Sequence, residues 1–113
     1  MRTASLVLVL VGALARASSG QNDRALAEQR TRIDALDVRI VALLNERAEV
    51  VREVGRIKKE AAAAASDPTR AAQVIERIAS ANRGPLPNEH LRRIYETILN
   101  EMTAFEAAEM SRK

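Results

Sequence analysis

The sequence predicts an all-α fold, and three observations lead to this prediction. Apolar residues recur at intervals of three, four and seven, and no stretch alternates between apolar and polar residues with period two. Alanine, leucine, arginine and glutamate dominate the composition, whereas aromatic residues make up only 2%. The three prolines stand at two predicted junctions, near residues 66–68 and 85–87. Together these features indicate a single domain of three helices.

The first predicted helix is long and runs from about Asp23 to Glu60. Its apolar seam consists of Leu26, Ile33, Leu36, Ile40, Leu43, Val50, Val54 and Ile57. A helix of this length spans about 55 Å at about 1.5 Å per residue, which is too long for a compact monomer of 113 residues. Much of the seam therefore needs a second chain, and we expect a homodimer.

Two shorter helices are predicted to follow. Asp67 is well placed as an N-cap, with Pro68 at the first helical position, and the helix that they open should end near Gly84. The third helix is predicted from about Asn88 to Glu109. The residues expected on its inner face are Leu91, Ile94, Tyr95, Ile98, Met102 and Phe105.

Residues 1–20 differ from residues 21–113, which form the predicted domain. Arg2 precedes an apolar run over residues 6–15, and a small-x-small pattern at residues 15–17 offers a cleavage site. This layout resembles a signal peptide and predicts export, for example to the periplasm. The alternative is an upstream start codon and a cytoplasmic protein. The apolar run is too short for a transmembrane helix, so no stable membrane association is expected.

Charge and composition exclude several classes of partner. The net charge of +3 permits acidic ligands, but basic and acidic residues are interleaved and aromatic residues for base stacking are few. Nucleic acid is therefore not expected as a partner. The chain has no cysteine and one histidine, His90, so we predict no cysteine or histidine metal site. His90 itself is expected to be an exposed residue in the first turn of the last helix.

Cations on the buried stripe of the first helix are the strongest functional signal. Arg47 stands on the seam where an apolar residue is expected, and it shares one helical face with Val51, Val54 and Lys58. A cation on the core side of a helix is costly unless an anion meets it there. Arg47 and Lys58 lie about 16 Å apart along the axis, so they could hold a small anionic ligand between them. The alternative is that both side chains reach solvent or pair with helix carboxylates.

Four further residues are candidates for the same site. A helix N-terminus with an arginine in its first turn suits a carboxylate ligand, which favours Asp67 and Arg70, although capping alone also explains Asp67. Arg30 lies about 25 Å from Arg47 on the same helix, so it could reach a site only across an antiparallel dimer. Glu106 falls at the edge of the apolar face of the third helix, where it could equally be exposed.

These residues carry a resemblance to a known family. The segments are Arg30-x-x-Ile33-Asp34-x-Leu36-Asp37, Leu43-Leu44-Asn45-Glu46-Arg47, Val54-Gly55-Arg56-Ile57-Lys58, Asp67-Pro68-Thr69-Arg70, Gly84-Pro85-Leu86-Pro87, Ile94-Tyr95-x-x-Ile98 and Phe105-Glu106. Their order and spacing, over about residues 24–108, resemble the all-helical chorismate mutases. The resemblance implies three helices intertwined as a homodimer and the conversion of chorismate to prephenate, which needs no metal or cofactor.

The resemblance also implies roles for individual residues. Arg47 and the partner's Arg30 would clamp the two substrate carboxylates. Lys58 would donate to a carboxylate and to the ether oxygen, and Glu106 would donate to the same oxygen. The pocket would also be lined by Asp67 and Arg70.

Two departures from the family pattern keep alternatives open. Ala71 stands where glutamate is frequent, and Met102 stands where a small hydroxyl residue is common. An isochorismate-pyruvate lyase of the same fold is therefore one alternative. A non-catalytic helical dimer is the other, although Arg47 on the seam speaks against it.

Overall fold

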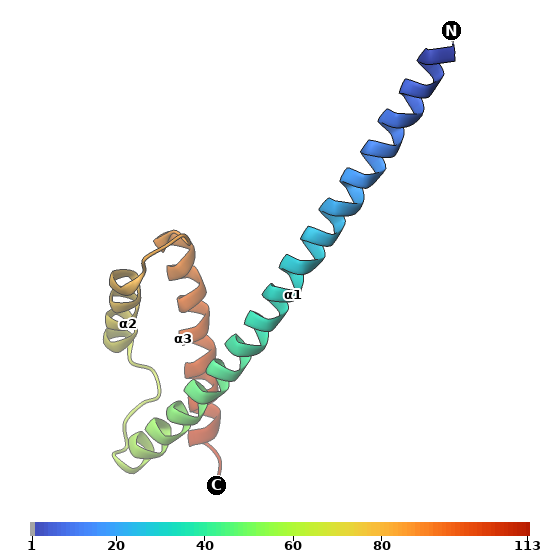
Figure 1. Ribbon diagram of the computed structural model, residues 1–113. Helices are drawn as coiled ribbons and strands as arrows, with labels where there is room; N and C mark the ends of the chain where they lie inside the picture. The colour runs from blue at the N-terminus through green and yellow to red at the C-terminus, as the bar shows by residue number, and fades with distance from the viewer. Residues whose placement is uncertain (1) are drawn as a thin grey trace. The chain divides into compact units, whose positions relative to one another are not determined.

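The computed structural model describes the backbone of residues 2–113 and the side chains of residues 19–113. It contains three helices, α1 (Arg2–Glu60), α2 (Pro68–Ala81) and α3 (Asn88–Met110) (Figure 1). The chain divides into one unit over residues 1–43 and a second over residues 44–113. The prediction of an all-α domain with a long first helix is confirmed. Most of the signal-peptide-like segment lies outside the residues whose side chains are described, and the export signal stays a prediction.

α1 begins earlier than the sequence pattern predicts. We expected the helix from about Asp23, whereas α1 includes Gly20, Gln21 and Asn22. No proline stands between Arg2 and Glu60, and a single glycine costs a helix only about 1 kcal/mol relative to alanine. The polar residues before Asp23 were therefore too weak a signal to end the helix.

The C-terminus of α1 is closed by a Schellman motif built from alanine. The N–H of Ala63 donates to the carbonyl of Lys58 at 2.8 Å, and the N–H of Ala62 donates to the carbonyl of Lys59 at 3.2 Å. Ala62 has a φ of 55°, a left-handed conformation in which glycine is usual. This turn ends α1 and directs the following loop toward α2.

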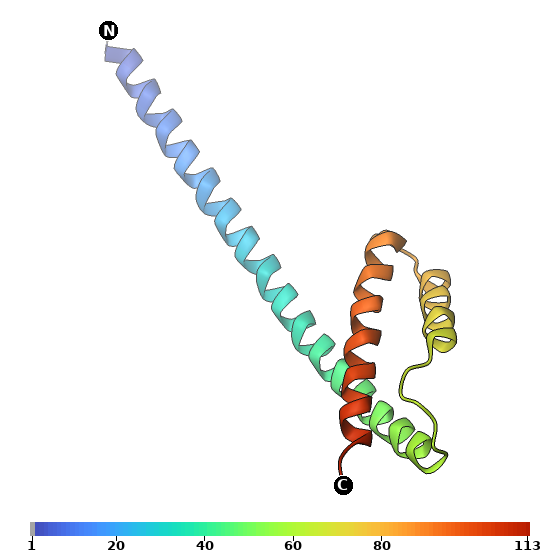
Figure 2. The same ribbon diagram turned by 180° about the vertical axis from the view of Figure 1, so that it is seen from behind.

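The sequence pattern predicted the boundaries of α2 and α3 closely. The carboxylate of Asp67 accepts a hydrogen bond from the N–H of Arg70 at 3.0 Å, and Pro68 begins the helix, as expected. Gly84 has a φ of 74°, which a residue with a side chain rarely adopts, and Asn82 holds this turn by accepting from the N–H of Gly84. Figure 2 shows α2 and α3 side by side after this connection.

An ion pair joins the exposed faces of α2 and α3. Arg92 donates to Glu76 at 2.7 Å, and this hydrogen bond holds the pKa of the Glu76 carboxyl below its usual range. The contribution of the pair to stability is therefore present at neutral pH and is lost as the pH falls through the lowered pKa. Since both side chains are exposed, solvent screens the pair and its contribution is small.

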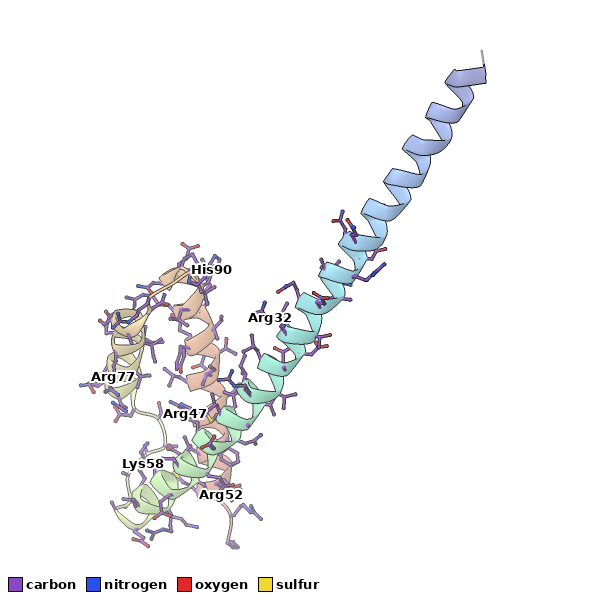
Figure 3. All side chains as sticks on the ribbon, viewed as in Figure 1. Arg32, Arg47, Arg52, Lys58, Arg77 and His90 are labelled. Atoms are coloured by element: carbon purple, nitrogen blue, oxygen red, sulfur yellow. The ribbon has the colours of Figure 1, made fainter. Side chains whose placement is uncertain are left out.

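The apolar interior of this chain is small. Among the residues whose side chains are described, the buried apolar residues are Val74 and Ala79. Ile94 was predicted on the inner face of α3 but is 49% exposed, because no helix among residues 19–113 covers that side of α3. Arg77 and His90, labelled in Figure 3, are exposed on α2 and at the start of α3, and His90 has the position predicted for it.

Candidate active site

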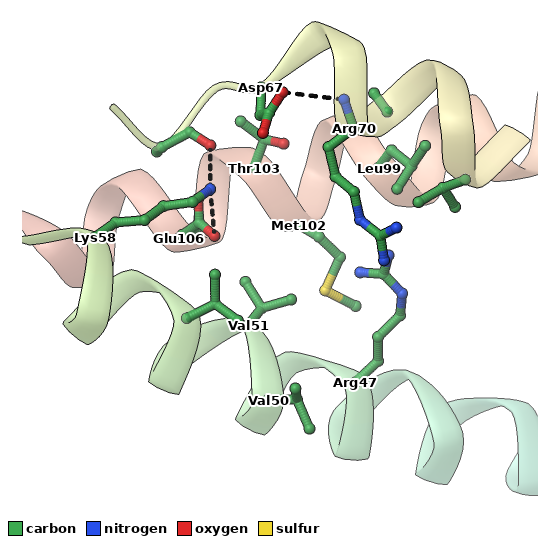
Figure 4. A pocket seen from close by; sticks show the side chains of 14 residues that line it. Arg47, Val50, Val51, Lys58, Asp67, Arg70, Leu99, Met102, Thr103 and Glu106 are labelled. Atoms are coloured by element: carbon green, nitrogen blue, oxygen red, sulfur yellow. Dashed lines mark hydrogen bonds and ion pairs between the residues drawn. The ribbon is translucent and has the colours of Figure 1, made fainter. Parts of the chain in front are cut away.

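A pocket of about 310 Å³ lies within the unit of residues 44–113. The last turns of α1, the beginning of α2 and one face of α3 form its walls (Figure 4). The charged residues that line it are Arg47, Lys58, Asp67, Arg70 and Glu106. Its apolar walls include Val51, Val54, Val74, Leu99 and Met102. Five of the six residues predicted for a site therefore line one pocket.

The helical period of α1 brings its two cations to this pocket. Arg47, Val51, Val54 and Lys58 follow at intervals of four, three and four, which keeps them on one face of the helix. All four line the pocket, with the valines between the cations. The polar groups thus stand at the two ends of an apolar floor.

Lys58 and Glu106 form a pair at one end of the pocket. The Nζ of Lys58 lies 3.0 Å from Oε2 and 3.3 Å from Oε1 of Glu106. Glu106 is only 5% exposed, so the alternative of an exposed surface residue is wrong. A carboxylate is buried at this depth only where a cation or hydrogen bonds compensate for its lost hydration, and Lys58 supplies both.

Lys58 is also tied to the loop that leads to α2. Its Nζ donates to the carbonyl of Ala65 at 2.9 Å, while its own carbonyl accepts from Ala63 in the Schellman motif. The ammonium group therefore has two fixed partners, the Ala65 carbonyl and the Glu106 carboxylate, which together offer three acceptor oxygens. An ammonium has three donors, so a ligand oxygen in the pocket could take the place of one Glu106 oxygen.

Arg47 and Arg70 stand at the other end of the pocket and extend toward one another from α1 and α2 (Figure 4). Within residues 19–113, neither guanidinium group has a hydrogen-bond or ion-pair partner. Asp67 accepts from the backbone N–H of Arg70 and not from its guanidinium group. Two guanidinium groups that face one another repel, and a carboxylate between them relieves this repulsion and accepts bidentate hydrogen bonds.

Asp67 has a structural partner as well as a place at the pocket. Its carboxylate caps α2 by accepting from the backbone N–H of Arg70 (Figure 4). Capping therefore accounts for Asp67 without a ligand, as the alternative interpretation held. The side chain also lines the pocket, so a second oxygen is available for a ligand hydroxyl group.

Arg30 belongs to α1 in the unit of residues 1–43 and is not among the residues that line this pocket.

The sequence pattern did not predict the role of the Ala65 carbonyl, because no side chain marks a backbone acceptor in a loop. It also gave little weight to Thr103, although Leu99, Thr103 and Glu106 follow at helical spacing on α3.

Two further findings concern metals and membranes. Among the residues whose side chains are described, no group of three or more histidine, cysteine, aspartate or glutamate residues could hold a metal ion. No helix in the same part of the chain is long and apolar enough to cross a membrane.

The fold and the pocket define an all-helical domain in which three cations and two carboxylates line one small pocket. Residues 29–107 match the family model for chorismate mutase type II. This match covers more than half of the chain, and the protein belongs to the chorismate mutase type II family.

Solved structures and curated relatives agree with this assignment. The structure of a chorismate mutase (form II) from Thermus thermophilus superposes with a TM-score of 0.70 at 28% identity, over 72% of this chain and 92% of that one. A bifunctional chorismate mutase/prephenate dehydratase from Neisseria gonorrhoeae is 37% identical over 84 residues. The corresponding protein from Aquifex aeolicus is 35% identical over 85 residues.

The relatives are much longer than this chain. The match covers 74% of this chain but only 23% of the Neisseria gonorrhoeae protein, and 72% of this chain but 24% of the Aquifex aeolicus protein. The chain thus spans about a quarter of the length of these relatives, and the similarity concerns a chorismate mutase domain.

Proposed function

We propose that this protein converts chorismate to prephenate within the metabolism of aromatic amino acids. One observation carries the proposal: two guanidinium groups without partners among residues 19–113 face one another at one end of the pocket, and a lysine paired with a buried glutamate stands at the other. Chorismate carries two carboxylates and an ether oxygen, which suit the two guanidinium groups and the Lys58–Glu106 pair, respectively. Membership in the family supports the same substrate.

The reaction suits a site without a nucleophile. In this rearrangement a C–O bond of the ether breaks while a C–C bond forms, and negative charge grows on the ether oxygen. Arg47 and Arg70 would hold the substrate in the compact conformer that reacts, which lowers the entropic part of the barrier. Lys58 would donate to the ether oxygen, as would Glu106 in its carboxylic acid form, and both would stabilise the transition state more than the ground state.

The proposed site is completed by a second copy of the chain. Leu26, Ile33, Leu36 and Ile40 on α1 are between 48% and 55% exposed, and the buried apolar core of one chain is small. Burying such side chains against a partner is worth about 1.5–3 kcal/mol each when burial is complete, which favours an intertwined homodimer. In that dimer, the partner's Arg30 would bind a substrate carboxylate opposite Arg47.

Turnover of two substrates by the purified protein tests this function. We expect the absorbance of chorismate to fall and prephenate to appear, and we expect no metal or cofactor to be needed. The lyase alternative rests on Ala71, which lines the pocket where a polar residue would contact a substrate hydroxyl. Production of salicylate and pyruvate from isochorismate, without prephenate from chorismate, would favour the lyase. Binding without turnover of either substrate would favour the non-catalytic dimer.

A further inference from the structure

Gly55 lies on α1 directly beneath α3, next to the proposed active site. It is buried, and a Cβ atom built on it would lie 3.2 Å from Cγ of Glu106 and 3.3 Å from Cγ of Met110. Gly20 on the same helix has nothing within 4 Å of the corresponding position. Glycine weakens a helix interior relative to alanine, so close approach of α3 is the physical reason for a glycine at residue 55.

The position of this contact connects it with the chemistry of the pocket. The Cγ atom of Glu106 packs against Gly55. The carboxylate that this Cγ carries pairs with Lys58, with 3.0 Å between Oε2 and Nζ. We propose that Gly55 is a positioning residue: the absence of a side chain there lets Glu106 approach α1 closely enough for its carboxyl group to share the ether oxygen with Lys58. This inference rests on the proposed function, because it concerns the donors of that reaction.

Contacts on either side of Glu106 limit how a larger residue could be accommodated. The guanidinium group of Arg52 lies over the ring of Phe105, 5.9 Å from its centroid, and the Nε of Arg52 lies 3.7 Å from Oε2 of Glu109. These two contacts, before and after Glu106 in the sequence, hold α3 against α1. A methyl group at residue 55 would therefore displace the Glu106 side chain by a few tenths of an ångström, or shift this end of α3.

Kinetics of Gly55→Ala in three backgrounds separate positioning from a general structural role. In the wild-type background we expect kcat to fall about tenfold, because small misplacements of a catalytic group are costly. KM should change by less than about twofold, since the contacts of Gly55 involve neither Arg47 nor Arg70. Gly55→Ala should lower kcat by the same factor in a Glu106→Gln background, where Cγ remains. It should lower kcat no further in a Glu106→Ala background, where Cγ is gone.

Two controls keep the result interpretable. Gly20→Ala adds the same methyl group to the same helix without a contact and should leave kcat unchanged. Circular dichroism should show that each variant keeps its helical content. An equal loss of kcat in the wild-type and Glu106→Ala backgrounds would overturn the inference, and so would no loss in either.

The proposed function can fail separately from this inference. If the wild-type protein does not turn over chorismate, the function is wrong, and crystal structures of wild type and Gly55→Ala then test the positioning alone. A lengthened distance from Lys58 Nζ to the Glu106 carboxylate in Gly55→Ala would support it. An unchanged distance would overturn it.

Discussion

The two units of this chain differ in the chemistry and burial of their side chains. In residues 44–113, cations and carboxylates gather around one pocket, and Glu106 is buried against Lys58. In residues 19–43, the apolar side chains of the helical seam are about half exposed, among them Ile33 and Ile40. The second unit therefore holds five of the six predicted site residues within one chain. The first unit presents an apolar surface that a second copy of the chain would cover.

Removing Lys58 should have the largest effect on the pocket unit. Lys58→Ala would take away a donor to the ether oxygen and leave the buried Glu106 carboxylate without its cation. We expect kcat to fall by about 10²–10³-fold, the scale for one lost transition-state donor. Stopped assays of chorismate consumption measure this.

The neighbouring lysine provides the matched control. Lys59 donates to the carbonyl of Arg112 and does not line the pocket, so Lys59→Ala should keep nearly full activity. Equal losses in both variants would mean that the charge of this helix end matters, and not the donor in the pocket.

A charge on the seam of the first unit should separate the chains without touching the pocket. Ile40→Glu would bury a carboxylate in the proposed dimer interface, so we expect monomers in sedimentation velocity and at least a tenfold loss of activity. Val38 is 69% exposed and about 200° around the helix from Ile40, so Val38→Glu is the control and should remain dimeric. Dimeric and active Ile40→Glu would contradict the proposed interface.

Replacing Glu106 with glutamine tests the second donor at the ether oxygen. A carboxyl group donates a hydrogen bond only in its protonated form, whereas a glutamine amide always carries N–H donors. Glu106→Gln should therefore turn over chorismate at least as fast as the wild-type protein, as steady-state kinetics would show. A loss of tenfold or more in Glu106→Gln would contradict a donor at this position.

The smallest expected effect concerns the turn after Lys58. Ala62→Gly should raise the free energy of unfolding by about 1 kcal/mol, because glycine adopts the left-handed conformation of residue 62 without strain. Urea denaturation measures the change. Ala64 has no positive φ, so Ala64→Gly should be neutral or slightly destabilising. A destabilised Ala62→Gly would contradict the strained turn.

The sequence predicted the fold well wherever side chains determine the local backbone geometry. Asp67 and Pro68 marked the start of α2, and the spacing of apolar residues gave α3 within one residue of its end. The spacing of Arg47 and Lys58 likewise predicted that both face one site. The beginning of α1 was missed because polar residues without a proline do not stop a helix that already propagates.

The interior of the site was harder to predict, because it depends on how helices approach one another. The burial of Glu106 depends on Gly55 lying opposite, and periodicity alone left that residue between buried and exposed. The Lys58 hydrogen bond to the carbonyl of Ala65 depends on the path of a loop, which no side-chain pattern records. Backbone groups and close packing thus account for most of what the sequence did not predict.

Subunit complementation tests most directly whether the two units work together across a dimer. Arg30→Ala and Arg47→Ala chains should each be nearly inactive alone. When they are unfolded and refolded together, half of the dimers should be mixed, and each mixed dimer contains one intact site. We therefore expect recovery of about a quarter of the wild-type activity. No recovery in mixed dimers verified by mass spectrometry, or full activity of Arg30→Ala alone, would contradict a site built from both chains.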